Sequence, residues 1–292
     1  FKLKPTVMKK RIFLMGLLLS FLTGLQAQKP IILPVWEQGA PESNGLTTNS
    51  DEKDAGRTQH TNEAQLYVYP AAHPNGMTIV CCPGGGYAHL AMQHEGTDMA
   101  AWMNSQGITL AVLQYRMPNG HKNVPSSDAY QAIRLLKQHA EEWHIDSNKI
   151  GIMGASAGGH LAATVANLAP ADVRPAFQIL LYPVITMGEG THQGSRENLL
   201  GKQAAETDVH DFSMELRVNE QTPKAFIALS SDDRAVPPGN SLNYATSLGK
   251  AGIPYSLHVY PIGGHGWGFR DSFPYKRQWT GELEKWLREI NQ

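Results

Sequence analysis

A serine between two glycines stands in Gly154-Ala155-Ser156-Ala157-Gly158, which fits the pattern Gly-x-Ser-x-Gly. The apolar run Ile150-Gly151-Ile152-Met153 precedes this segment, and an alanine-rich stretch follows it. A strand, a tight turn and a helix in this order expose a serine hydroxyl, whereas an ordinary Gly/Ser turn needs no such flanks. Glycines suit the turn because side chains there would collide with neighbouring backbone. We therefore predict that Ser156 is a nucleophile.

A serine hydroxyl needs a base that accepts its proton, and the chain has 12 histidines. His265 lies in Gly263-Gly264-His265-Gly266-Trp267, directly after the last predicted strand, where glycines allow a sharp turn. His258 lies inside the last predicted strand, 255–260. His139 lies in the helix predicted at 126–143, and His144 lies at the end of that helix. The histidines of polar loops carry no signal of their own: His60, His73, His121, His192 and His210. His265 is the predicted base.

An acid that orients the histidine is expected between the serine and the histidine in the chain, as in one large class of serine hydrolases. Asp232 and Asp233 follow the apolar run at 225–229. Asp233 stands three residues before Val236-Pro237, which is the usual placement of such an acid, and we predict that it orients His265. Asp232 is the alternative, and it could instead shape the turn through its own backbone.

Three glycines follow the apolar run 77–82 in Pro83-Gly84-Gly85-Gly86-Tyr87. Such a run can be a flexible turn and nothing more. In serine hydrolases a glycine-rich stretch at this place supplies a backbone N–H to the oxyanion, together with the N–H after the nucleophile. The predicted oxyanion hole consists of the N–H groups of Gly85, Gly86 and Ala157.

The elements that must position these residues alternate along the chain. Strands are predicted at 77–82, 108–115, 149–153, 177–182, 224–230 and 255–260, and helices at 96–106, 126–143, 157–168, 241–250 and 275–290. This alternation favours a mainly parallel central sheet with helices on both faces. Ligands bind such sheets beyond the carboxyl ends of the strands. Ser156, Asp233, His265 and the glycine run all follow strands, so we expect them to meet at one edge.

The pattern divides the chain into three parts. Residues 62–292 are long enough for one α/β domain. Residues 28–61 are rich in Pro, Gly, Asn, Ser and Thr and are predicted to be an irregular lead-in. The polar segment 186–222 interrupts the alternation and is predicted to be a small insertion over the sheet and the active site.

The N-terminal residues 1–27 resemble a secretory signal peptide. Lys9, Lys10 and Arg11 precede an apolar run at 12–22, and Leu25-Gln26-Ala27 is a small-residue cleavage pattern, so cleavage is expected after Ala27. Met8 is the more natural start. A membrane anchor is the alternative, but the run is about half of the roughly 20 residues that a bilayer requires. We expect a secreted or periplasmic protein with no membrane association after cleavage.

Charge and cysteine content limit the kinds of partner that the chain is expected to bind. The formal net charge is −1 and no basic stripe is visible, so nucleic acid is not an expected partner. The two cysteines, Cys81 and Cys82, are adjacent in an apolar run. Neighbouring cysteines rarely satisfy disulfide geometry, and the sequence has no zinc-ligand spacing. We expect both cysteines to be buried strand residues, and we expect no metal site. The sequence carries no feature that indicates an oligomeric state.

Several of these segments together resemble one protein family. They are Cys82-Pro83-Gly84-Gly85-Gly86-Tyr87, His94-Glu95-Gly96, Tyr115-Arg116, Gly154-Ala155-Ser156-Ala157-Gly158-Gly159-His160-Leu161 and Gly263-Gly264-His265-Gly266. The chain is similar, over about residues 66–286, to secreted bacterial α/β-hydrolases of the acetyl-xylan-esterase-like type, which are related to feruloyl esterases and hormone-sensitive-lipase-like esterases. Pro83 stands where the lipase-like branch has histidine.

The resemblance implies an α/β-hydrolase fold and a serine carboxylesterase. Its substrates would be acyl esters, chiefly O-acetyl groups on plant polysaccharides or oligosaccharides, cleaved through an acyl-enzyme without a metal or organic cofactor. Tyr87, Trp267 and the segment 187–214 are predicted to line the acyl and sugar subsites. His160 and Arg116 are predicted to be structural supports.

Other activities remain open. A feruloyl or general short-chain carboxylesterase fits the same motifs. A serine peptidase of the prolyl-oligopeptidase type usually carries a propeller domain, for which the chain has too few residues, and a lipase would carry a long apolar lid. A non-catalytic carbohydrate-binding protein with this fold would lack a member of the triad, and the sequence contains all three.

Overall fold

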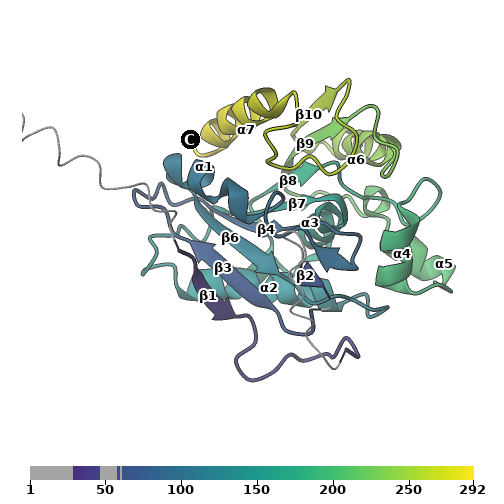
Figure 1. Cartoon of the computed structure of the whole chain (residues 1–292), viewed down its shortest axis with the longest axis horizontal. Coiled ribbons are helices and arrows are strands. Elements are labelled where there is room, and N and C mark those ends of the chain that lie inside the picture. Colours follow the sequence, from purple (N-terminus) through teal and green to yellow (C-terminus); the bar gives the residue numbers. More distant parts are fainter. Residues whose placement is uncertain (1–28, 47–57, 60) are drawn as a thin grey trace, which may run out of the picture.

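A mainly parallel sheet carries the predicted site. Its strands are β1 (Ile31–Pro34), β3 (Gln65–Tyr69), β4 (Thr78–Cys82), β6 (Thr109–Gln114), β7 (Ile150–Ala155), β8 (Phe177–Leu181), β9 (Lys224–Ser230) and β10 (Tyr255–Tyr260). This computed structural model describes residues 29–46, 58, 59 and 61–292, and within them these eight strands form one sheet in the order β1-β3-β6-β4-β7-β8-β9-β10 (Figure 1). The pairs β1–β3 and β3–β6 are antiparallel, and the others are parallel. The predicted sheet is confirmed.

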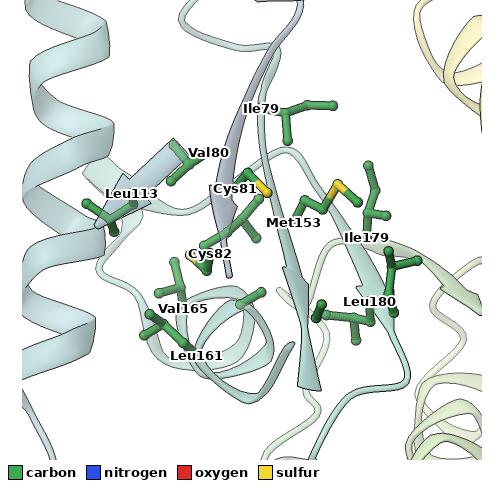
Figure 2. Packing of buried hydrophobic residues seen from close by; sticks show 14 of the residues in the cluster. Ile79, Val80, Cys81, Cys82, Leu113, Met153, Leu161, Val165, Ile179 and Leu180 are labelled. Atoms are coloured by element: carbon green, nitrogen blue, oxygen red, sulfur yellow. The ribbon is translucent and has the colours of Figure 1, made fainter. Parts of the chain in front are cut away.

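The central strands are apolar on both faces, as expected for parallel strands covered twice. Every residue of β4 is buried, including Cys81 and Cys82, which are free thiols. Burial raises the pKa of both thiols. Figure 2 shows Cys82 on the side of β4 that faces Leu161 and Val165 of the helix α3 (Ser156–Leu168). The two cysteines are therefore core residues, as the sequence predicted.

Helices cover both faces of the sheet (Figure 1). The main ones are α1 (Ala100–Ser105), α2 (Val124–Gln138), α3 (Ser156–Leu168), α6 (Gly239–Lys250) and α7 (Lys276–Ile290). Trp102 of α1 and Trp279 of α7 meet edge to face, 5.9 Å apart, so these two helices lie together. The predicted helix 96–106 is split, because a 3₁₀ turn at Thr97–Met99 precedes α1. Another 3₁₀ turn occupies Ala171–Val173.

The insertion, residues 186–222, forms two short helices and a turn between β8 and β9. These are α4 (Gln193–Leu200), α5 (Glu206–Asp211) and a 3₁₀ turn at Met214–Leu216. Asn198 of α4 donates a hydrogen bond to the carbonyl of Gly86, 2.8 Å away. An ion pair between Lys122 and Asp208 joins α5 to the segment before α2. The insertion therefore rests against the glycine loop, as expected for an insertion over the site.

The predicted irregular lead-in, 28–61, is wrong in part. β1 pairs antiparallel with β3, and β2 (Thr58–Gln59) pairs with β5 (His89–Leu90). The side chain of Asn44 donates to the carbonyls of Thr61 and Met117. β1 is short and ends in proline, which an edge strand tolerates because one side of it needs no partner. This segment therefore completes the sheet.

The predicted signal peptide, residues 1–27, lies outside the described residues and stays a prediction. In the part of the chain that the structure does describe, no helix has both the length and the apolar character needed to cross a bilayer.

Candidate active site

Ser156 stands on a sharp turn between β7 and α3. Its φ of 54° lies in the left-handed region, which is unusual for a residue other than glycine. Neighbouring glycines permit this turn, because a Cβ on Gly158 would lie 2.0 Å from the carbonyl oxygen of Cys82. A Cβ on Gly154 would lie 2.0 Å from the carbonyl oxygen of Gly158. The steric role predicted for these glycines is confirmed, and the turn presents the hydroxyl of Ser156 beyond the sheet.

The structure brings the three predicted triad residues into one hydrogen-bonded row. His265 Nε2 lies 2.8 Å from Ser156 Oγ, and His265 Nδ1 lies 2.7 Å from Asp233 Oδ2. Since the carboxylate can only accept, Nδ1 donates to Asp233 and Nε2 accepts from the serine hydroxyl. Asp233 is buried, while the side chain of His265 is partly exposed. The imidazole is therefore held in the tautomer that can take the serine proton.

The two adjacent aspartates have separate roles. Asp233 Oδ1 accepts from the N–H groups of Ala235 and Val236, each at 2.9 Å, so the loop after β9 fixes its orientation. Asp232 is exposed and points to the loop after β10, where it accepts from the N–H of Gly264 at 2.8 Å and of Gly263 at 3.3 Å. The hydrogen bond from Gly264 contributes most to lowering the pKa of Asp232. Asp232 therefore stabilises the loop that carries His265.

The loop after β4, residues 83–87, lies beside Ser156. Gly85 has φ 133°, and a Cβ on it would lie 2.1 Å from the carbonyl oxygen of His89, so this position requires glycine. Within the described residues we find no acceptor for the N–H groups of Gly85 and Gly86. The N–H of Ala157 belongs to the first turn of α3, whose N–H groups have no partner in the helix. These three donors remain the predicted oxyanion hole.

A buried carboxylate, Glu95, connects the glycine loop to the histidine loop. Glu95 Oε2 accepts from the N–H of Gly84 at 2.7 Å, and Oε1 accepts from the hydroxyl of Tyr182 at 2.9 Å. That hydroxyl in turn accepts from the N–H of Gly268 at 2.7 Å. The ring of Tyr182 packs edge-on against His265, 4.9 Å away. Burial raises the pKa of Glu95, while the hydrogen bonds from Tyr182 and Gly84 lower it.

A cavity of about 780 Å³ opens over Ser156. Trp267 lines it, as predicted, but this side chain is mostly buried: it stacks on Phe273 at 4.2 Å and donates to Ser230. Tyr87 was expected to line a subsite as well. Its side chain is only 2% exposed and does not line this cavity, because its hydroxyl bonds to His160 Nδ1 at 2.9 Å in the interior. Tyr87 is therefore a packing residue.

The two predicted supports occupy buried positions. His160 of α3 donates from Nε2 to the carbonyl of Phe212, 2.8 Å away, and thereby connects α3 to the insertion. Burial lowers the pKa of His160 to about 4, so its ring is neutral. Arg116 pairs with Asp128 at 2.7 Å, with both side chains almost fully buried. Trp36, from the N-terminal segment, donates to the same carboxylate.

The insertion also lines the cavity, through His192, Gly194 and Asn198. The expectation that segment 187–214 reaches the site thus agrees with its placement. Across the described residues, no group of three or more His, Cys, Asp or Glu side chains is arranged to hold a metal ion.

A family model described as the alpha/beta hydrolase fold matches residues 79–269. This chain belongs to that family. The resemblance predicted from the motifs is therefore confirmed, and the matched range contains Ser156, both loops that carry its partners and the insertion.

Individual relatives of this α/β hydrolase have more specific names than the family model. The chain is 36% identical over 288 residues to an acetylxylan esterase of Xylanibacter ruminicola, which covers 97% of this chain and 55% of that protein. It is 36% identical over 204 residues to endo-1,4-beta-xylanase B of Butyrivibrio fibrisolvens, covering 64% of this chain and 32% of that protein. The chain thus spans about half, or less, of the length of these relatives.

A solved structure resembles this α/β hydrolase over nearly its whole length. It is an acetyl ester-xyloside bifunctional hydrolase from Caldicellulosiruptor lactoaceticus, with a TM-score of 0.77 and 34% sequence identity. The alignment covers 91% of this chain and 98% of that one.

Sequence reasoning missed three side chains of this α/β hydrolase site. Glu95 was noticed only as part of a family segment, Tyr182 only as the end of a strand, and His192 only as a loop histidine. Glu95 lies between the glycine loop and the helix predicted at 96–106. A carboxylate at this place was a usable signal, because a buried carboxylate needs hydrogen-bond partners. Tyr182 and His192 had no comparable signal, since the partners of Tyr182 lie far away in the chain and His192 reaches the cavity only through the fold of the insertion.

Proposed function

We propose that this chain is a serine carboxylesterase that hydrolyses acyl esters, chiefly O-acetyl groups on plant polysaccharides or their oligosaccharides. The observation that carries the proposal is the hydrogen-bonded row from Asp233 through His265 to Ser156, which opens on a cavity large enough for a sugar ester. The acetyl and xylan preference is supported by the names of the acetylxylan esterase and the acetyl ester-xyloside hydrolase that this chain resembles.

The geometry supports acyl transfer in two steps. Ser156 Oγ attacks the ester carbonyl carbon as its proton passes to His265 Nε2, and Asp233 stabilises the imidazolium without taking the proton. The tetrahedral intermediate collapses, the carbon–oxygen bond to the alcohol breaks, and His265 returns the proton to the leaving oxygen. Water then attacks the acyl-enzyme with His265 as base, which releases the carboxylic acid and restores Ser156.

The oxyanion is the charge that this site must stabilise. Its proposed donors are the N–H groups of Gly85, Gly86 and Ala157, which lie beside the nucleophile. The positive end of the α3 dipole points at the same place. Loss of one such donor typically costs about 3 kcal/mol of transition-state stabilisation. The hydrogen bond from Gly84 to Glu95 supports this role, because it fixes the direction in which the glycine loop runs.

Substitution of the nucleophile tests the proposal. Wild-type protein should release acetate from p-nitrophenyl acetate and from acetylated xylan, and Ser156→Ala should lower kcat by a factor of about 10⁴ or more. Circular dichroism and thermal melting should show that the variant is folded. Unchanged activity in the folded variant would remove Ser156 as the nucleophile and, with it, the proposed mechanism.

A substrate panel tests the acyl group. Initial rates on matched acetyl, butyryl, feruloyl and peptide substrates should be highest for the acetyl esters. A preference for feruloyl esters would replace the acetylesterase proposal with the feruloyl alternative, and cleavage of peptides alone would contradict both.

We also propose that the protein is exported, because residues 1–27 have the pattern of a signal peptide. Expression of the chain in a bacterial host and N-terminal sequencing of the exported product should give Gln28 as the first residue. Retention of the uncleaved chain in the cytoplasm would contradict export.

A further inference from the structure

His192, which no step of the mechanism uses, lies directly before α4 in the insertion. Its Nδ1 accepts a hydrogen bond from the backbone N–H of Ser195 at 3.2 Å and lies 2.8 Å from Ser195 Oγ. A backbone N–H can only donate, so Nδ1 carries no hydrogen. The remaining hydrogen of the neutral ring is therefore on Nε2. The cap of α4 fixes this tautomer, as second partners commonly do for histidine.

The ring of His192 is held in its neutral form. It is half-buried, and this burial is the main cause that lowers its pKa, with a smaller contribution from nearby His265. In the described part of the chain we find no hydrogen-bond acceptor on Nε2. His192 therefore offers an uncharged N–H donor whose partner is not supplied by these residues.

The position of the ring brings this donor to the reaction. His192 lines the same cavity as Ser156 and His265. Its Cε1 atom lies 3.5 Å from the place where a side chain on Gly86 would begin, so the ring stands against the glycine loop. His265 is close enough for its charge to act on His192. The leaving alcohol must lie near His265 Nε2 to receive its proton, and His192 lines the cavity in which that alcohol lies.

We infer that His192 is a substrate-binding residue whose Nε2–H donates a hydrogen bond to a sugar hydroxyl next to the acylated carbon. This inference rests on the proposed function. The hydroxyl beside an acetylated carbon is the polar group that distinguishes a carbohydrate ester from a simple ester. A neutral donor suits this place, because a second cation beside His265 would oppose the imidazolium that forms during proton transfer.

Two substitutions separate this donor from the helix cap. In His192→Asn the side-chain oxygen can take the place of Nδ1 and accept from the N–H of Ser195, since asparagine is a good N-cap residue. This variant has no donor at the position of Nε2. In His192→Gln the longer amide can place an N–H near that position. Gln193→Ala is the matched control, because Gln193 is exposed and its side chain bonds only to Glu197 in the described structure.

The test compares kcat/KM for a mono-acetylated xyloside with kcat/KM for p-nitrophenyl acetate. His192→Asn should lower the value for the xyloside about tenfold, the usual scale for one lost hydrogen bond, and change the value for p-nitrophenyl acetate less than about twofold. His192→Gln should recover part of the loss, and Gln193→Ala should behave as the wild type. Equal losses on both substrates, or no loss on either, would overturn the inference.

A second measurement changes the substrate. Replacing the hydroxyl beside the acetyl group by hydrogen in the xyloside should lower the wild-type kcat/KM about tenfold, the scale of one lost hydrogen bond. The same change should have no further effect in His192→Asn. A wild type that does not distinguish the deoxy substrate overturns the inference alone. A wild type that is inactive on every acetylated sugar overturns the proposed function and the inference together.

Discussion

The strand-end loops, which are the turns after β4, β7, β9 and β10, and the insertion at residues 186–222 both line the cavity, but different contacts hold them. The helix α3, which begins at Ser156, buries nearly all of its residues, and the neighbouring loops are joined to one another through Glu95 and Asp232. In the insertion, α5 buries no residue. The rest of the insertion places Leu199, Phe212 and Met214 in the core, and hydrogen bonds of His160 with Phe212 and of Asn198 with Gly86 join it to α3 and the glycine loop.

This difference indicates that the two regions have different roles, proton transfer in the strand-end loops and recognition of the alcohol in the insertion. Proton transfer needs atoms held within a few tenths of an ångström, and the buried loops with their hydrogen-bonded backbones provide such positions. Recognition of the alcohol needs a wall that can differ between related enzymes, and an insertion outside the central sheet provides one. Changes in the loops should therefore affect kcat for every ester, and changes in the insertion should affect only some substrates.

The largest expected effect follows from Asp233→Asn. The amide keeps an oxygen for the N–H groups of Ala235 and Val236 but can present its NH₂ to His265, which favours the wrong tautomer. We expect kcat to fall by about 10⁴-fold. The loss should be similar for p-nitrophenyl acetate and acetylated xylo-oligosaccharide in steady-state assays. A loss restricted to the sugar substrate would break the proposed division between the regions.

A pH-dependent effect is expected at His160, which joins the two regions. Burial lowers its pKa from 6.5 to about 4, so the unfolded state binds a proton more readily than the native state. Its contribution to stability is therefore complete above pH 6.5 and is lost as the pH falls through about 4. By pH 4 the loss is about 3 kcal/mol of unfolding free energy.

Urea denaturation of wild type and His160→Gln at several pH values measures this contribution. The difference in unfolding free energy between the two proteins should shrink, in the direction that disfavours the wild type, as the pH falls from 7 to 4. Parallel pH profiles for the two proteins would show that His160 is not the titrating group.

The smallest expected effect is that of Asp232→Ala. This change removes the acceptor for the N–H groups of Gly263 and Gly264 while leaving the Asp233–His265 bond in place. Because His265 then sits on a looser loop, we expect kcat to fall about fivefold, with little change in KM. Stopped-flow measurement of the p-nitrophenol burst would show whether acylation is the step affected. A loss as large as that of Asp233→Asn would make Asp232 the orienting acid instead.

The two regions also differ in how far the sequence could predict them. Ser156, Asp233 and His265 each follow a strand within a short segment whose glycines, proline and apolar flanks state the local geometry. The parallel sheet followed from the same local patterns. His192 had no such neighbours, because its position over Gly86 depends on how 186–222 folds back on the glycine loop. The N-terminal strand β1 was also missed, since four residues that end in proline give a weak pattern.

That strand has a practical consequence. β1 covers one side of β3, whose other side is occupied by β6. A shortened protein that starts at residue 62 would leave the N–H and C=O groups of β3 open along that side. Open strand edges recruit strands of other molecules and promote aggregation. The N-terminal segment thus protects this edge of the sheet from aggregation, and the shortest soluble form of this protein should begin ahead of Ile31.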